Sequence, residues 1–186
     1  MSEKIIILVG PSGAGKTSFL ERALSEYKSL RDIITYTTRE MRPGEKEGDP
    51  YHFVTKEKFE ALIKEDFFVE YARVHTNLYG VPEHLIREAW ADGDTVIMDI
   101  DVQGAETIKK KFPQTLGVFV MPPDLDSLRQ RVIGRDGEKP DLEIRMKNAE
   151  NEMKLAEHFE YQLVNDDFDS CYLGLKKIID ETLNQG

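Results

Sequence analysis

A short segment near the N-terminus has the residue types and spacing of a phosphate-binding loop (P-loop). Residues 10–17 read Gly-Pro-Ser-Gly-Ala-Gly-Lys-Thr and fit the pattern G-x-x-x-x-G-K-[ST]. In this pattern the glycines let backbone N–H groups face phosphate oxygens, the lysine adds a positive charge, and the hydroxyl can ligate Mg²⁺. A turn without a ligand would leave the lysine and the hydroxyl unexplained. The sequence therefore predicts a nucleotide site at Gly10, Pro11, Ser12, Gly13, Ala14, Gly15, Lys16, Thr17 and Ser18, with Thr17 on Mg²⁺.

This loop does not by itself distinguish a GTPase, an ATPase motor and a small-molecule kinase. Signalling GTPases carry a guanine-specificity element, Asn-Lys-x-Asp, which the sequence lacks. The most similar string, Asn165-Asp-Asp167, has no lysine. A GTPase of the signalling type is therefore disfavoured.

Two aspartates follow an apolar run that has the composition of a buried strand. Residues 95–99 read Thr-Val-Ile-Met-Asp, and Asp101 comes two positions later. Because ligands bind at the carboxyl ends of parallel strands, Asp99 is expected beside the phosphate loop. If the strand continues, Asp99 and Asp101 share one of its faces. A second interpretation, equally good from the sequence, is that Asp101 caps the following helix.

Arginines are concentrated in a charged segment later in the chain. Arg131 and Arg135 are four residues apart and share one face of an expected helix, apart from its apolar stripe. Arg145 lies near the start of a second amphipathic helix. A single arginine of this kind is usually only solvated. Together with a phosphate loop, three of them predict neutralisation of charge during phosphoryl transfer.

Short apolar runs alternate with amphipathic stretches along the chain, which is the pattern of an α/β fold. Apolar segments at 5–9, 96–101, 117–121 and, more weakly, 161–164 are typical of parallel strands covered on both faces. Helical spacing of apolar residues over 16–27 follows the phosphate loop. We therefore expect a three-layer core around a parallel sheet.

Two segments interrupt this alternation. Residues 33–93 contain turn residues, two short helices and short β-like pieces, which indicates an inserted mixed α/β lobe. The β-like pieces are expected at 33–36, 51–54 and 68–74. Residues 123–158 are helical, charged and rich in arginine, which indicates a helical lid. The core is then expected to comprise residues 1–32, 94–122 and 159–186.

The composition limits the class of protein. A chain of 186 residues with 40% hydrophobic and 32% charged residues is typical of a globular protein, and no apolar run approaches the roughly 20 residues that span a membrane. The net charge of −10 argues against binding nucleic acid. Cys171, the only cysteine, excludes an internal disulfide. No secretory signal is recognisable, so we expect a cytoplasmic protein, with monomer and homo-oligomer both open.

The segment at 35–53, Thr-Tyr-Thr-Thr-Arg-Glu-Met-Arg-Pro-Gly-Glu-Lys-Glu-Gly-Asp-Pro-Tyr-His-Phe, closely resembles the GMP-binding signature of guanylate kinases. Further blocks of that family follow in its order at 68–72, 79–80, 97–104, 122–123, 131–135 and 164–167. The resemblance covers essentially all 186 residues. It implies that the γ-phosphoryl group of ATP passes directly, in line, to GMP with Mg²⁺ as cofactor, giving ADP and GDP, and that the inserted lobe binds GMP.

The resemblance also assigns roles to single positions. The implied GMP-binding residues are Thr35, Arg39, Arg42, Glu45, Tyr51, Glu70, Tyr79, Asp99 and Asp101. Lys16 and the lid arginines Arg131, Arg135 and Arg145 are implied to be catalytic, and Asn165 to lie near the adenine of ATP. Arginine and tyrosine donors suit the GMP phosphate, with Glu45 orienting the arginines. Glu70 would accept from guanine N1–H and N2–H₂, donors that adenine lacks.

Three departures separate this chain from the family pattern. Thr35 adds a methyl group where serine is usual, and Val81 replaces a serine or threonine, so that one hydroxyl contact to guanine is lost. The interval from Arg135 to Arg145 is one residue shorter than usual. Two alternatives follow. A guanylate-kinase-like protein-interaction module is disfavoured by the intact phosphate loop, whereas a related P-loop kinase with another phosphorylated acceptor is kept open by Val81.

Overall fold

A five-stranded parallel sheet forms the centre of the protein. The structure, a computed structural model, describes residues 3–74 and 76–184. The strand order is β10-β9-β1-β8-β2. These strands are β1 (Ile5–Val9), β2 (Leu30–Asp32), β8 (Thr95–Asp99), β9 (Leu116–Met121) and β10 (Tyr161–Val164). Every side chain of β1 is buried, as expected for a central strand with helices on both faces.

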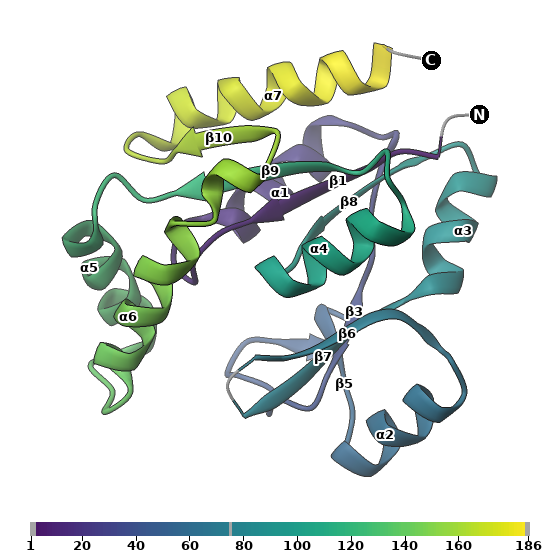
Figure 1. The fold of residues 1–186 in the computed structure, drawn as a ribbon, viewed down its shortest axis with the longest axis horizontal. Coiled ribbons are helices and arrows are strands. Elements are labelled where there is room, and N and C mark those ends of the chain that lie inside the picture. The colour runs from purple at the N-terminus through teal and green to yellow at the C-terminus, as the bar shows by residue number, and fades with distance from the viewer. Residues whose placement is uncertain (1–2, 75, 185–186) are drawn as a thin grey trace.

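Helices cover both faces of this sheet. Ile6 and Leu8 of β1 pack in a cluster with residues of α1 (Lys16–Glu26) and α7 (Phe168–Asn184). The intervening residues of β1 point the other way and pack with α3 (Glu83–Ala91), α4 (Val102–Lys111) and the 3₁₀ helix η1 (Ala156–His158). Figure 1 shows α7 and α4 on opposite sides of the sheet. The predicted three-layer α/β core is confirmed.

A second, mixed sheet lies within the segment expected to form a lobe. Its strand order is β4-β5-β3-β7-β6. The strands are β3 (Thr35–Thr37), β4 (Lys46–Glu47), β5 (Pro50–Phe53), β6 (Phe68–Val74) and β7 (Asn77–Pro82). Helix α2 (Lys56–Lys64) packs on it through Phe59, whose ring stacks on Phe68 at 4.6 Å. The lobe therefore has a sheet of its own with a helix packed on it, while Val69 and Val81 of this sheet pack in the apolar cluster of the core.

The β-like pieces of this segment were predicted unevenly. The prediction of 68–74 is confirmed, and that of 51–54 is one residue late at each end. The strand predicted at 33–36 is observed only in part: β3 covers residues 35–37 in the lobe sheet, residues 30–32 pair in the core sheet, and Ile33 is buried between the two strands. A run of apolar and β-branched residues shows β-propensity, but only tertiary pairing divides it between two sheets.

Helix α3 ends the predicted lobe segment but packs on the core. It lies against β8, and its Ile86, Ala89 and Trp90 are buried in the cluster on the α4 face of the core sheet. The indole Nε1 of Trp90 donates to the carbonyl of Lys4 at 3.1 Å. This helix therefore connects the lobe sheet firmly to the core. The division of the chain into core, lobe and lid otherwise stays a prediction.

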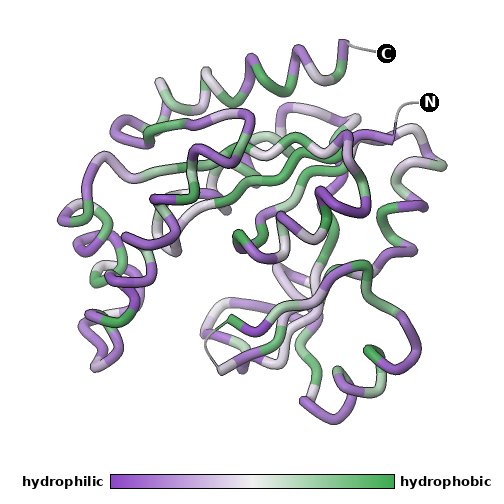
Figure 2. Tube along the Cα trace, viewed as in Figure 1, coloured by the Kyte–Doolittle hydropathy of each residue, from purple (hydrophilic) through white to green (hydrophobic). Residues whose placement is uncertain are grey.

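The predicted helical segment forms α5 (Leu125–Asp136) and α6 (Leu142–Met153). Asp124 caps α5, its carboxylate accepting from the N–H of Ser127 at 2.6 Å, and Gly137 with φ 74° ends the helix. The two helices share a small apolar cluster of Leu128, Val132, Leu142, Met146 and Ala149. Figure 2 shows apolar residues concentrated along the central strands, whereas this helical pair is largely hydrophilic. Among the described residues, no helix is both long and apolar enough to cross a membrane.

Candidate active site

The phosphate loop connects β1 to α1 at the carboxyl end of the core sheet. Two of its glycines cannot be replaced. Gly10 has φ +139° and a Cβ there would lie 2.2 Å from the carbonyl oxygen of Val120; Gly15 has φ +102° and a Cβ would lie 2.5 Å from Nδ2 of Asn165. Gly15 is the N-cap of α1 and offers no capping side chain. The first N–H groups of the helix are thereby left for an anion.

Lys16 and Thr17 are held beside Asp99. Lys16 Nζ donates to the carbonyl oxygens of Gly10 at 2.7 Å and Pro11 at 3.2 Å, and lies 3.7 Å from Oδ1 of Asp99. The Thr17 hydroxyl donates to Oδ2 of Asp99 at 2.9 Å. Asp99 ends β8, which is paired in register with β1. The sequence prediction that an acidic strand end adjoins the phosphate loop is confirmed.

Asn165 supports the phosphate loop from behind. Its side chain is buried and donates from Nδ2 to the carbonyl oxygen of Ala14 at 2.8 Å. The backbone carbonyl oxygen of Asn165 accepts from Nη2 of Arg131 at 2.8 Å. The amide donor of Asn165 is therefore occupied by the loop backbone, and Arg131 is fixed to the same segment. The expected position of Asn165 near an adenine stays a prediction.

The other two lid arginines meet over the phosphate loop. Arg135, from α5, and Arg145, from α6, both donate through Nη2 to the Ser12 hydroxyl, at 3.0 Å and 3.3 Å. Arg145 lies in this position although the interval between the two arginines is short. The structure thus brings two guanidinium groups together at the part of the loop where phosphate is expected.

Asp101 caps helix α4. Strand β8 ends at Asp99, and the Asp101 carboxylate accepts from the N–H groups of Gln103 at 2.8 Å and Gly104 at 3.0 Å. Of the two interpretations of Asp101 that the sequence left open, the helix cap is the one observed. A contact of Asp101 with GMP stays a prediction, because one carboxylate oxygen, Oδ2, is not used by the cap.

Arg39 is fixed in the lobe by Glu45. Its Nη1 and Nη2 donate to the two Glu45 oxygens at 3.0 Å and 2.8 Å, and Glu45 also accepts from the backbone N–H of Arg42 at 2.7 Å. The guanidinium lies 5.4 Å from the ring centroid of Tyr51. Hydrogen bonds from Arg39 hold the pKa of Glu45 below its usual range. Glu45 therefore orients the Arg39 side chain, but only the backbone of Arg42, whose side chain is exposed.

Two tyrosines lie near Arg39, and Thr35 pairs with one of them. Thr35 pairs with Tyr51 across β3 and β5, and Tyr79 lies opposite Thr37 on β7. The Tyr51 and Tyr79 rings meet edge to face at 5.8 Å. Burial, and then the negative charge of Asp99, raise the pKa of Tyr51. This hydroxyl therefore stays protonated and can donate to an anion.

Glu70, on strand β6, carries a buried carboxyl group in the lobe. It is 6% exposed and lies against helix α4, where a Cβ on Gly104 would come within 3.0 Å of its Cδ and 3.1 Å of both its oxygens. No hydrogen bond to its carboxylate is found among the described residues, and its oxygens are not among the fully buried side-chain atoms that lack a partner, so they keep some access to solvent. Burial, and to a smaller extent the charge of Asp101, raise the pKa of Glu70 to about 8. A ligand with two N–H donors would relieve this cost.

Known proteins resemble this chain along nearly its whole length. The family model described as guanylate kinase matches residues 2–182. The chain belongs to the guanylate kinase family. The guanylate kinase of Bdellovibrio bacteriovorus is 50% identical over 184 residues, spanning 98% of this chain and 100% of that protein. That of Rickettsia felis is 41% identical over 177 residues, spanning 94% of this chain and 92% of that protein.

A solved guanylate kinase structure has the same fold. The crystal structure of guanylate kinase from Anaplasma phagocytophilum matches with a TM-score of 0.79 at 29% identity, spanning 96% of this chain and 85% of that chain. The resemblance to guanylate kinases and the α/β fold class predicted from the sequence are therefore confirmed. The roles of single site residues stay predictions that rest on the geometry above.

Three residues of this guanylate kinase family member were missed by sequence reasoning. Gly104 supports Glu70, and Asp136 pairs with the lid arginines. Glu152, near the end of α6, is half-buried; burial raises its pKa, the positive charge of Lys16 opposes that rise, and the charge of Asp101 adds to it. Only Asp136 had a signal in the sequence, its position directly after Arg135. The other two depend on contacts between distant segments.

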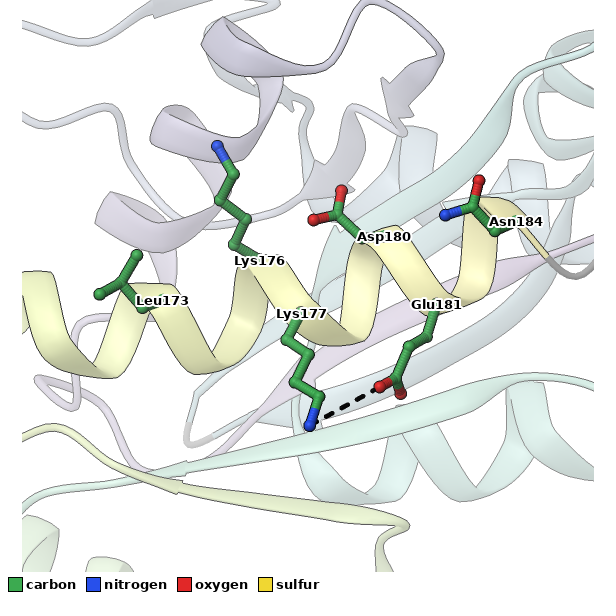
Figure 3. A pocket seen from close by; sticks show the side chains of 6 residues that line it. All are labelled: Leu173, Lys176, Lys177, Asp180, Glu181 and Asn184. Atoms are coloured by element: carbon green, nitrogen blue, oxygen red, sulfur yellow. Dashed lines mark ion pairs between the residues drawn. The ribbon is translucent and has the colours of Figure 1, made fainter.

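A shallow pocket on α7 lies outside this site. It is lined by Leu173, Lys176, Lys177, Asp180, Glu181 and Asn184. Figure 3 shows these side chains along one helix, with an ion pair of 3.9 Å between Lys177 and Glu181. None of them is a predicted site residue, and the pocket has no buried polar group aimed into it. The predicted site residues lie instead on the phosphate loop, in the segment predicted to form the lid and in the segment predicted to form the lobe.

Proposed function

We propose that this chain is an ATP:GMP phosphotransferase, which passes the γ-phosphoryl group of ATP directly, in line, to GMP and yields ADP and GDP. The relatives named above are guanylate kinases and align over almost the whole chain. The observation that carries the proposal is that Asp99 contacts Lys16 and Thr17 of the phosphate loop, while Glu45 holds the Arg39 guanidinium in the lobe with two hydrogen bonds. The chain therefore presents positively charged groups for phosphate on both the loop and the lobe.

On the ATP side, the loop backbone and the first N–H groups of α1 would hold the phosphates. Lys16, which donates to loop carbonyls at 2.7 Å and 3.2 Å, would transfer its donors to phosphate oxygens. Arg135 and Arg145, now on Ser12, would do the same and neutralise the charge that spreads over the transferred group. Arg131 would act from its position against Asn165.

On the GMP side, the phosphate would lie against Arg39, Arg42, Tyr51 and Tyr79. Arg39 is already oriented by two hydrogen bonds to Glu45, so little side-chain freedom is lost when the acceptor binds. The planar guanidinium offers paired donors that match a phosphate, and tyrosine hydroxyls add directional donors. The acceptor oxygen is itself anionic, so positioning and charge neutralisation replace a strong general base.

The base would be selected by Glu70. Guanine presents N1–H and N2–H₂ together, and both can donate to one carboxylate. Adenine has no such pair and would leave a buried carboxylate unsatisfied, which costs binding free energy. Thr35 would donate its hydroxyl to the base, and Asp99 and Asp101 would lie at the edge of the GMP site. Val81, buried opposite Glu70 in the strand pair, offers no hydroxyl.

The residues at the phosphate loop suit Mg²⁺. The Thr17 hydroxyl and the Asp99 carboxylate lie 2.9 Å apart and are oxygen ligands of the kind this ion prefers. No cluster of three or more acidic, histidine or cysteine side chains able to hold a metal occurs in the described part of the chain, in line with an ion held mainly by substrate phosphates and water. When bound, Mg²⁺ supplies positive charge to the phosphates; Thr17 and Asp99 would hold it.

The proposal also covers the binding partners and the cellular location of the enzyme. A net charge of −10 favours small nucleotides, bound in a local basic site, over nucleic acid as the partner. A cytoplasmic location is where ATP and GMP are both available. The first statement rests on the net charge and the second on the proposed substrates.

A coupled assay with ATP and a panel of acceptors tests the proposed function. GMP, dGMP, IMP, AMP and UMP would each be offered to the wild-type protein with Mg²⁺. We expect turnover with GMP and dGMP, weaker turnover with IMP, which has no 2-amino donor, and little with AMP or UMP. No turnover with GMP would refute the proposal. Faster turnover with another acceptor would favour the related kinase that Val81 leaves open.

A further inference from the structure

Asp136 connects two of the lid arginines. As the last residue of α5, it accepts from Nε of Arg135 at 3.1 Å through Oδ1, and from Nη2 of Arg135 and Nη1 of Arg145, each at 2.9 Å, through Oδ2. Its side chain is only 6% exposed, although it belongs to a hydrophilic part of the molecule. One carboxylate thus bridges α5 and α6 at the face that meets the phosphate loop.

The negative charge of Asp136 offsets the repulsion between the Arg135 and Arg145 guanidinium groups in the protein without ATP. Both guanidinium groups donate to the single hydroxyl of Ser12, at 3.0 Å and 3.3 Å. Two like charges this close repel each other, most strongly where they are partly buried. The hydrogen bonds from Arg135 and then Arg145 hold the pKa of Asp136 far below its usual range, with the charge of Arg42 acting in the same direction. Asp136 therefore remains an anion at any working pH.

We propose that Asp136 is a positioning residue for phosphoryl transfer, which holds Arg135 and Arg145 side by side over Ser12 before ATP binds. This inference rests on the proposed function. Arg135 donates to Asp136 through Nε and Nη2. Its Nη1 group stays available to phosphate oxygens, and so do the Nη2 donors of Arg135 and Arg145 once they leave the Ser12 hydroxyl. Donors arranged in advance need no reorganisation during the reaction. The bridge also keeps Arg145 beside Arg135 despite the short interval between them.

The lid contains a natural control for this bridge. Arg129 and Glu143 form another ion pair between α5 and α6. The Glu143 side chain is 76% exposed, and neither residue contacts the phosphate loop in the described structure. The two pairs join the same helices, but only Asp136 contacts the arginines that reach Ser12. Comparing a variant without the Asp136 carboxylate with a variant without the Glu143 carboxylate therefore separates the positioning of the arginines from the general stability of the lid.

Steady-state kinetics of D136N, D136S, D136E and E143Q test the inference, with ATP and GMP varied in turn and thermal midpoints measured alongside. D136N and D136S should each lower kcat about 10- to 100-fold, as expected for misplaced catalytic groups, with KM for GMP within about 3-fold of wild type, since Asp136 hydrogen-bonds only to Arg135 and Arg145 among the described residues and acts on Arg42 only through its charge. D136E, which retains the charge, should recover part of kcat. E143Q should stay within about 2-fold of wild type.

Several results would overturn the inference. Equal losses in D136N and E143Q would mean that any bridge between the helices suffices. A higher kcat in D136N would mean that Asp136 competes with ATP for the arginines. If neither D136N nor D136S folds while E143Q does, Asp136 is a structural residue. Absence of GMP turnover in the wild type would refute the proposed function instead, so the two failures are distinguishable.

Discussion

The two halves of the candidate site differ in how their polar groups are satisfied. Around the phosphate loop, Lys16 bonds to loop carbonyls, Thr17 to Asp99, and Arg135 to Ser12 and Asp136. In the lobe, Glu70 is buried with no hydrogen bond to its carboxylate among the described residues, and its pKa is raised to about 8. The named groups around the phosphate loop have partners within the protein, and so do Arg39 and Glu45 in the lobe, whereas Glu70 has none among the described residues.

This difference teaches how the two substrates are distinguished. A phosphate loop with satisfied groups offers fixed positions and positive charge, which suit any nucleotide with Mg²⁺. Burial keeps the Glu70 carboxyl group protonated in the free protein, and a ligand with two matching donors offsets the cost of ionising it. Positioning therefore dominates on the ATP side and selectivity on the GMP side. Changes in the first half should reduce kcat, and changes in the second should raise KM for GMP.

The largest effect is expected for Lys16→Ala. Removal of the ammonium takes away the charge that the loop holds for the terminal phosphates, and kcat should fall at least about 10³-fold, comparable to loss of a major transition-state donor. Circular dichroism and thermal unfolding should stay close to wild type. Lys56→Ala serves as the control, since Lys56 is an exposed residue of α2. More than about a tenth of wild-type kcat in Lys16→Ala would contradict the role assigned to the loop.

Glu70→Gln should act on GMP alone. The amide replaces one acceptor by a donor that opposes guanine, so KM for GMP should rise on the order of 100-fold, with KM for ATP within about 3-fold. Kinetics with each substrate varied separately measure the two values. Equal rises in KM for ATP and KM for GMP would show that Glu70 does not act on the GMP side alone.

The raised pKa of Glu70 predicts a pH dependence of the same selectivity. Below pH about 8 the free protein holds a proton on Glu70 that guanine binding must displace. KM for GMP should therefore fall as the pH rises from 6 to 8, by up to about tenfold per unit, and then level off. The stability that the protonated group gives to the free protein should be lost as pH rises through about 8. A flat profile in the wild type, matching that of Glu70→Gln, would contradict this interpretation.

Gly104→Ala should weaken GMP binding through Glu70. The added methyl group would lie 3.0–3.1 Å from the Glu70 carboxylate and displace it, raising KM for GMP about tenfold. Gly134→Ala is the matched control, because it too lies in a helix and a Cβ there meets nothing within 4 Å. Both variants gain helix propensity. Equal KM values for GMP in the two variants would show that Gly104 does not position Glu70.

The smallest effect is expected for Val81→Thr. Val81 is 1% exposed and packs in the apolar cluster with Val69 and Ile86. A hydroxyl buried there should cost about 1–2 kcal/mol of folding stability, while KM for GMP changes less than about 3-fold. Thermal unfolding and GMP kinetics measure the two effects. A tenfold gain in preference for GMP over AMP would instead show that position 81 reaches the base.

The elements with a strong local pattern were predictable. The phosphate loop, strand β1, strand β6 and the arginine-bearing helices follow from hydrophobic periodicity and glycine spacing. The division of residues 30–37 between two sheets was not, because short strands are specified by their partners. The place of α3 on the core was missed for the same reason: an amphipathic helix does not indicate which apolar surface will cover it.

The sequence by itself determined the nucleotide loop, the acidic end of β8 and the membership suggested by the lobe signature, since residues a few positions apart carry those features. Only the tertiary structure decided that Asp101 caps α4, that Asn165 supports the loop, and that Glu70 lies on Gly104. Asn165 and Ala14 are 151 positions apart. Contacts of that range arise from the packing of sheet, lid and lobe, which local spacing does not encode. The same packing gives the polar groups around the phosphate loop their partners and leaves Glu70 without one among the described residues.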